Sequence, residues 1–236
     1  MNNVLTIAGR EVRAYFASPV AYVVIAAFLA INGLLFALIL FSTREASLRY
    51  LFGNMAIILM LVSPALTMRL LAEEQRAGTI ELLLTLPVRD AEVVLGKFLG
   101  GLALLVTMLV FTAYYPATLF YLGNPDVGPI LSGYIGALLL GSTFLAIGLL
   151  ASSLTQNQIV AAVISFVALL ALWLIGFAAD YLGTNLGAIV RYLGVVDHYS
   201  EFAQGIVDTK DVVFYLSLIA FALFATIRSL ETRRWR

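Results

Sequence analysis

The side chains with the clearest potential for chemistry lie between residues 69 and 88, where a charged turn is followed by an apolar one. Glu73, Glu74 and Arg76 crowd the charged turn, and an isoleucine and four leucines follow before Pro87. A charged run alone is most often a solvated loop, with a few apolar neighbours pressed against lipid headgroups. The apolar surface here is too large to leave in water without a binding site. The segment is therefore predicted to dock onto a soluble protein.

Local signals divide this segment into two short helical pieces. Gly78 interrupts the charged turn, either by relaxing the backbone or by allowing a partner to approach closely. Thr79 can cap a new helix whose first turn carries Glu81, a favourable charge at the positive end of a helix, and Pro87 ends that helix. Leu83 is the candidate to fill an apolar cleft of the partner. The predicted docking residues are Glu73, Glu74, Arg76, Gly78, Thr79, Glu81, Leu83 and Pro87.

The glycine and lysine pattern argues against nucleotide chemistry. A phosphate-binding loop needs G-x-x-x-x-G-K-[ST], in which backbone amides cradle the phosphates and the lysine neutralises them. Gly96 and Lys97 form the one Gly-Lys pair, and it is followed by Phe98 and lacks the upstream glycine. The chain is therefore predicted not to hydrolyse ATP by itself and to bind no cofactor.

His198 stands beside Asp197 and Glu201, which suggests a metal ligand set. A lone histidine near two carboxylates is more often a hydrogen-bonded structural residue, because zinc sites usually need three or four protein ligands. The chain has no cysteine to complete such a set or to act as a nucleophile. We expect no metal site and no catalytic residue.

These residues must be positioned by helices that cross a membrane. Of 236 residues, 62% are hydrophobic and 12% are charged, and the mean hydropathy is +0.99, which predicts an all-α, polytopic membrane protein of one domain. A span needs about 20 apolar residues to cross about 30 Å of hydrocarbon. Six stretches qualify: 20–41, 51–68, 98–122, 129–151, 159–178 and 212–227.

The interiors of these spans contain no Asp, Glu, Lys, Arg or His. Ion-coupled carriers usually need an ionisable group at membrane depth, and intramembrane proteases need catalytic groups there, so both classes are disfavoured. Four glycines between 133 and 148 allow close helix approach, which is only weak evidence for a dimer face. Pro64 and Pro116 are expected to bend the second and third spans.

Residues 1–19 form an amphipathic segment with Arg10 and Arg13 on its polar face and Leu5 on its apolar face. It is predicted to lie along the inner membrane surface, as a passive anchor or as a second docking surface.

Of the 14 Lys and Arg residues, ten lie inside and four outside if the N-terminus is cytosolic, so both termini are predicted to be cytosolic. The loop 69–97 is then internal. The outer segment 179–211 is apolar enough to form short interfacial helices that cap an exit pathway or receive an extracytoplasmic partner.

Several of these motifs together resemble one family. Ser18-Pro19, the run from Glu73-Glu74 through Gly78-Thr79 to Pro87-Val88, and Leu95-Gly96-Lys97 resemble the permease subunits of ABC-2 type transporters. Residues 198–215 look like the gliding-motility-type branch, to which the nitrous-oxide-reductase maturation permeases are related. The resemblance covers essentially the whole chain.

The resemblance implies an ABC-2, type V exporter-like half-transporter of the bacterial inner membrane. It would pair with a second permease, identical or different, and with cytosolic ABC ATPase subunits that hold ATP and magnesium. The segment 69–97 would be the coupling helix, and the transport direction would be export. Membrane lipid is an expected partner and nucleic acid is not. The alternative function is a membrane anchor or scaffold for an ATPase machine that translocates nothing itself.

Overall fold

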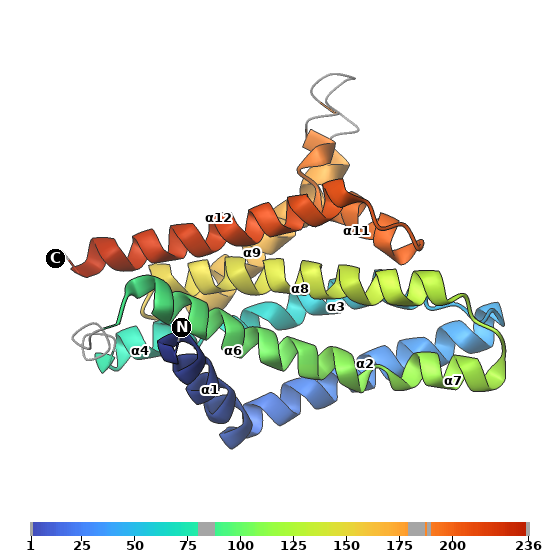
Figure 1. Cartoon of the computed structure of the whole chain (residues 1–236), viewed down its shortest axis with the longest axis horizontal. Helices are drawn as coiled ribbons and strands as arrows, with labels where there is room; N and C mark the ends of the chain where they lie inside the picture. Colours follow the sequence, from blue (N-terminus) through green and yellow to red (C-terminus); the bar gives the residue numbers. More distant parts are fainter. Residues whose placement is uncertain (1, 80–87, 179–186, 188–189, 235–236) are drawn as a thin grey trace.

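The structure, a computed structural model, describes residues 2–79, 88–178, 187 and 190–234, and these residues form helices without any strand. Figure 1 shows the helices as one bundle, with α8 between α12 and α6. The elements are α1 (Asn2–Ala17), α2 (Pro19–Thr43), α3 (Arg49–Thr67), α4 (Ala72–Arg76), α6 (Asp90–Phe111), α7 (Tyr114–Leu122), α8 (Val127–Leu154), α9 (Gln158–Ala178), α11 (Val195–Ala203) and α12 (Thr209–Arg234).

Six helical stretches of the described chain are long and apolar enough to cross a membrane, which confirms the predicted number and order of spans. They are formed by α2, α3 with α4, α6 with α7, α8, α9 and α12. The largest error lies at the third span, which begins at Asp90 rather than near residue 98. The backbone N–H of Arg89 donates to Glu92 Oε2 at 2.9 Å, so a capped polar turn precedes the apolar part of this helix.

The predicted bend of the third span is an interruption between α6 and α7, just before Pro116. In a continuous helix the carbonyl of Thr112 would accept from the N–H of residue 116, which proline lacks. That carbonyl instead accepts from Tyr115 N and from the Tyr134 hydroxyl, both at 2.9 Å. A tyrosine of α8 therefore satisfies the backbone group that the proline leaves open.

The α8 helix is the centre of the bundle, and its glycines make that possible. It packs against α3, α6, α9, α11 and α12. A Cβ added to Gly136 would lie 2.6 Å from Phe202 Cβ, and one added to Gly148 would lie 2.1 Å from Thr67 Oγ1. The glycines of α8 that touch other helices in this way are Gly133, Gly136, Gly141 and Gly148. They serve packing within the chain, and the weak suggestion of a dimer face is not needed to explain them.

Part of the outer segment packs as a helix, as expected, while residues 179–186 and 188–189 lie outside the described residues. Helix α11 rests on α8, and His198 is buried there. Its Nδ1 lies 2.5 Å from Asp211 Oδ1, and its Nε2 lies 2.9 Å from the Tyr192 carbonyl. His198 therefore joins α11 to α12 through Asp211. Among the described residues, no group of three or more potential ligands surrounds it.

Candidate functional site at the α4 end

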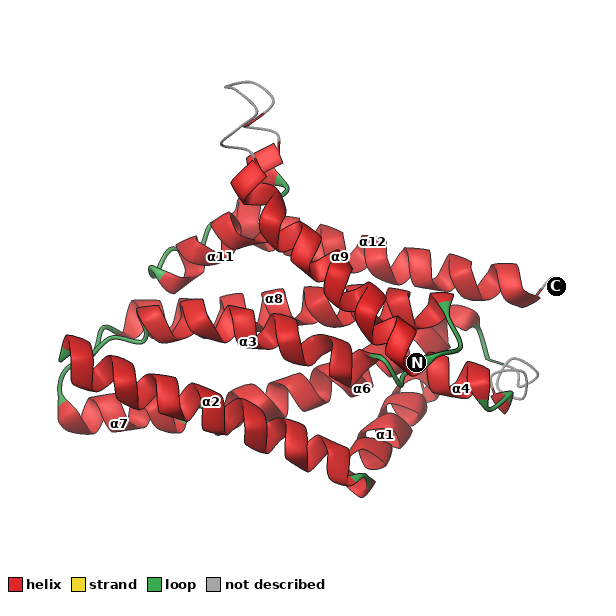
Figure 2. Cartoon of the chain, turned by 180° about the vertical axis from the view of Figure 1, so that it is seen from behind, coloured by secondary structure: helices red, strands yellow, loops and turns green. Residues whose placement is uncertain are grey.

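One end of the bundle, where α4, the first turns of α6 and the last turns of α12 lie, gathers most of the predicted docking residues (Figure 2). We call it the α4 end, and the opposite end the α7 end. The described docking residues there are Glu73, Glu74, Arg76, Gly78 and Thr79. The remaining three, Glu81, Leu83 and Pro87, lie outside the described residues.

A buried acid–base cluster connects three helices at this end. Lys97 of α6 is 1% exposed, and its Nζ lies 3.1 Å from Glu11 Oε1 and 2.9 Å from Glu74 Oε1. Arg10 reaches the same two oxygens at 3.0 and 3.1 Å from its exposed side. Two cations and two carboxylates therefore alternate, which is the arrangement that offsets the cost of burying charge. We call these four residues the Lys97 cluster.

Small residues of α6 allow α1 to come close enough to complete the cluster. A Cβ on Gly96 would lie 2.6 Å from Ile7 Cγ2, and one on Gly100 would lie 2.5 Å from Glu11 Cβ. The contact face of α1 therefore includes Glu11, whereas Leu5, assigned to the apolar face, is 63% exposed. Figure 1 shows α1 crossing α6. The amphipathic segment is a helix, as predicted, and one side of it packs against α6.

The same helix is joined to α3 by Tyr15, whose hydroxyl donates to the Leu66 carbonyl at 2.8 Å. Burial raises the pKa of the Tyr15 phenol, so it remains a neutral donor. Arg13, in contrast, is exposed and has no ion pair among the described residues. The two predicted arginines of α1 thus have different environments: Arg10 belongs to the Lys97 cluster, and Arg13 faces outward.

Helix α4 depends on α8 for its N-terminal cap. Leu71 occupies the cap position and has no polar side chain to satisfy the first backbone N–H groups. Ser152 of α8 supplies the acceptor: its Oγ lies 3.1 Å from Leu71 N and 3.0 Å from Ala72 N. Gln75 Nε2 also donates to the Ser153 carbonyl at 3.0 Å. A five-residue helix is therefore fixed to the central helix of the bundle by three hydrogen bonds.

The Ser153 carbonyl extends this connection to the last span. Ser229 of α12 donates to it from Oγ at 3.5 Å, a long contact that brings α12 to the same point. Helices α8 and α12 also pack along their lengths. A displacement of α4 would thus act on α8 and α12 through Ser152 and Ser153, and on α1 and α6 through the Lys97 cluster.

The exposed part of α4 presents Arg76 to solvent. Arg76 lines a polar hollow of about 700 Å³ together with Thr155, Gln156 and Asn157 from the connection between α8 and α9. That connection is held in place, because Ile159 N donates to Asn157 Oδ1 at 2.9 Å and caps α9. The hollow is a fixed, polar surface beside a guanidinium that forms no ion pair with any described residue, and it is suited to receive a side chain of another protein.

The glycine after α4 is explained by its backbone. Gly78 has φ +69, a conformation that residues with a Cβ rarely adopt, and an added Cβ would meet no atom within 4 Å. Of the two sequence interpretations, backbone relaxation accounts for Gly78 within this chain. Thr79 donates from Oγ1 to the Glu74 carbonyl at 3.3 Å, and the N–H groups it was predicted to cap lie outside the described residues.

Sequence reasoning missed Glu11 and Lys97, which form the Lys97 cluster together with Arg10 and Glu74. The signal was present in Gly96-Lys97 followed by Gly100, where two glycines one turn apart flank a lysine at the edge of a span. A lysine in that position has to be paired or reach the headgroups, since burial of an unpaired charge is costly. Its partners lie 86 and 23 positions away, and no local pattern connects them.

Six candidate spans, of which the glycine-containing helix α8 is the central one, describe an integral membrane protein in which the short surface helix α4 is hydrogen-bonded to a span. Residues 7–227 match the family model described as "ABC-2 family transporter protein", and the chain belongs to this family. Two similar proteins are each named "Probable multidrug ABC transporter permease YbhS", from Escherichia coli strain K12 and from O157:H7. Each is 34% identical over 199 residues, covering 77% of this chain and 50% of the relative. The chain spans about half the length of the curated relatives it matches.

Proposed function

We propose that this chain is the permease subunit of an ABC transporter, driven by separate ATPase subunits and acting as an exporter of the inner membrane. The family supports a transporter subunit. The observation that carries the coupling role is α4, which exposes Arg76 while its first turn is hydrogen-bonded to α8 and its Glu74 is paired with Lys97. ATP and magnesium would be held by the ATPases, and this chain would bind neither.

The mechanism follows from these connections. ATP binding brings the ATPases together, and the docked α4 moves with them. Because α4 is tied to α8 and to the Lys97 cluster, its movement shifts α1, α6 and α8 as connected rigid elements. ATP thereby biases the equilibrium between inward-open and outward-open arrangements of the spans.

A second permease subunit is part of the proposal. Within the 18-residue apolar stretch that represents each span, 72% of the residues of α8 are buried inside the chain. The corresponding share is 17% in α2 and α9 and 22% in α12. These three spans leave wide apolar faces for lipid or for a paired subunit, identical or different.

We place the chain in the gliding-motility-type branch on residues 198–215. The name of the YbhS relatives makes drug-like amphiphiles the first cargo to screen.

The proposed orientation places α4 and both termini in the cytosol, and it can be tested with single cysteines because the chain has none. Glu45→Cys and Asn124→Cys, at exposed sites of the α7 end, should react with an impermeant maleimide added to intact cells. Ala77→Cys and Thr232→Cys, exposed at the α4 end, should react only after the membrane is opened. Labelling of Ala77→Cys in intact cells would reverse the orientation.

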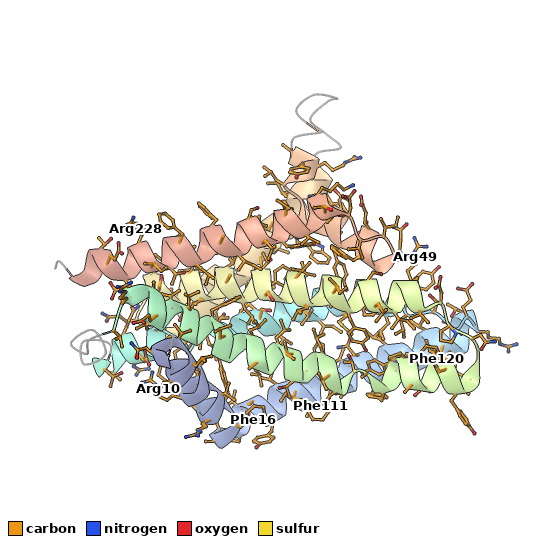
Figure 3. The ribbon with its side chains drawn as sticks, viewed as in Figure 1. Arg10, Phe16, Arg49, Phe111, Phe120 and Arg228 are labelled. Atoms are coloured by element: carbon orange, nitrogen blue, oxygen red, sulfur yellow. The ribbon has the colours of Figure 1, made fainter. Side chains whose placement is uncertain are left out.

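The docking role of α4 is tested by charge reversal. Arg76→Glu should weaken association with the ATPase about tenfold or more, since reversing a charge at an interface introduces repulsion. Arg49→Glu is the matched control, because Arg49 is exposed at the other end of the bundle (Figure 3). Binding of the purified ATPase to each variant in nanodiscs measures the effect. Equal affinity for both variants would contradict docking at Arg76.

Leu83→Asp extends the same experiment to the apolar part of the docking segment, which lies outside the described residues. If Leu83 enters a cleft of the ATPase, burying an unpaired carboxylate costs several kcal/mol and should lower affinity by about a hundredfold. A complex that forms normally but shows no substrate-stimulated ATP turnover with any screened compound would favour the scaffold function instead.

A further inference from the structure

A groove of about 900 Å³ opens between α1, the start of α2, the end of α3 and α4. Its lining combines apolar side chains with charged and hydroxyl groups. Tyr15 and Leu66 are both part of the lining, and the hydrogen bond between them joins α1 to α3. The apolar lining consists of Ala14, Val20, Ala21, Ala65, Leu66 and Leu70.

Most charges that line the groove are already paired. Lys97 and Arg10 are bound by Glu11 and Glu74 within the Lys97 cluster. Arg69 and Glu73 also line the groove, and both are exposed. Among the described residues neither of these two side chains takes part in an ion pair. Within the described part of the chain, the groove therefore offers one guanidinium and one carboxylate without an ion pair, together with apolar side chains.

The groove also lies at the boundary of the apolar layer. Helix α2 begins its apolar run at Pro19, and α3 ends at Thr67, so Val20 and Leu66 lie at the ends of two spans. At such a boundary the abundant ligands are lipids, whose headgroups bind charged pockets between spanning helices. Pockets of about 300–1,000 Å³ with apolar walls and a few polar groups are typical ligand sites.

We propose that this groove binds a membrane aminophospholipid, phosphatidylethanolamine. The Arg69 guanidinium would hold the phosphate through paired N–H donors, and the Glu73 carboxylate would accept from the primary ammonium. The acyl chains would follow the apolar wall past Ala21 and Ala65. Phosphatidylglycerol has no amine for Glu73, and the quaternary ammonium of phosphatidylcholine has no N–H to donate.

The test uses the purified chain in nanodiscs made from equimolar phosphatidylethanolamine, phosphatidylglycerol and phosphatidylcholine. Native mass spectrometry then identifies the lipids that remain bound after release from the nanodisc. We expect phosphatidylethanolamine to be enriched on the wild-type protein. Glu73→Gln should reduce that enrichment about tenfold, the loss expected for one hydrogen bond to a charged group. Arg69→Gln should instead lower the amount of all three lipids that remains bound, because the phosphate is common to them.

Arg13→Gln is the control for unspecific attraction of lipid by positive charge, since Arg13 is exposed on α1 and does not line the groove. It should leave the enrichment unchanged. Three results would overturn the proposal: no selectivity among the lipids on the wild-type protein, an equal loss with Arg13→Gln, or enrichment of phosphatidylglycerol that is insensitive to Glu73→Gln. The wild-type comparison needs no variant, so poor folding of one variant does not remove the test. The experiment also needs no ATPase, so its outcome is independent of the coupling role.

Discussion

Replacing Lys97 with methionine is expected to lower the free energy of unfolding by about 3 kcal/mol, the cost of leaving buried charges without their partner. Methionine fills a similar volume and removes only the ammonium. Glu11 and Glu74 would then face each other with Arg10 alone between them, and Arg10 is half exposed. The contacts that hold α1 and α4 against α6 should loosen together, because one nitrogen joins them.

Unfolding of the purified protein in mixed micelles by increasing denaturing detergent measures this loss. Lys210→Met is the matched control: Lys210 pairs with Glu201 in a largely exposed position, and surface pairs contribute little. The triple variant Lys97→Met, Glu11→Gln, Glu74→Gln should recover part of the stability, since it removes the unpaired charges as well. Equal losses for the two lysine variants would show that the buried cluster does not hold these helices.

Gly148→Ala is expected to destabilise the bundle by about 2 kcal/mol, and Gly148→Val by more, because α8 has no room for a side chain there. The added Cβ would lie 2.1 Å from Thr67 Oγ1 and 2.8 Å from Thr67 Cβ. Thr67 is fully buried and its hydroxyl donates to the Ser63 carbonyl at 2.9 Å, so it cannot easily turn away. Helices α3 and α8 would have to separate.

Gly53→Ala is the control for this substitution. Gly53 lies in α3, and a Cβ there meets no atom within 4 Å. Alanine should be neutral or slightly stabilising at that position, as it is the better helix former. Thermal unfolding followed by circular dichroism compares the variants, and Gly148→Ala combined with Thr67→Ala should regain part of the loss. If Gly148→Ala and Gly53→Ala change the unfolding temperature equally, α3 and α8 are not packed tightly at Gly148.

The spans were predictable because crossing a membrane imposes a length and a composition that hydropathy measures directly. The start of α6 was not, since its first turn is capped by Glu92 and contains charged residues that a hydropathy window rejects. For the same reason Lys97 was assigned to a loop, although it is buried in a helix. Composition reports how apolar a segment is, and it does not report which polar residues find partners.

The candidate residues pair with residues that are far away in the sequence. The carboxylates nearest to His198 in the sequence are Asp197 and Glu201. In the folded chain, however, the carboxylate that contacts its ring is Asp211, thirteen positions away. Glu73 and Glu74 are adjacent in sequence and were treated as one charged turn, whereas the structure exposes Glu73 and pairs Glu74 with Lys97. Neighbours on a short helix point in different directions, so adjacency does not predict a shared role.

The cap that Ser152 gives to α4 has a consequence for how the chain is made. Helix α4 is five residues long and has no cap of its own, and isolated helices of that length are not stable in water. Its stabilising hydroxyl belongs to a residue that the ribosome adds 80 positions later. A nascent chain therefore cannot form the finished surface of α4 until the fourth span has been synthesised and packed beside the second. The docking surface proposed for α4 is thus completed only once α8 is in place.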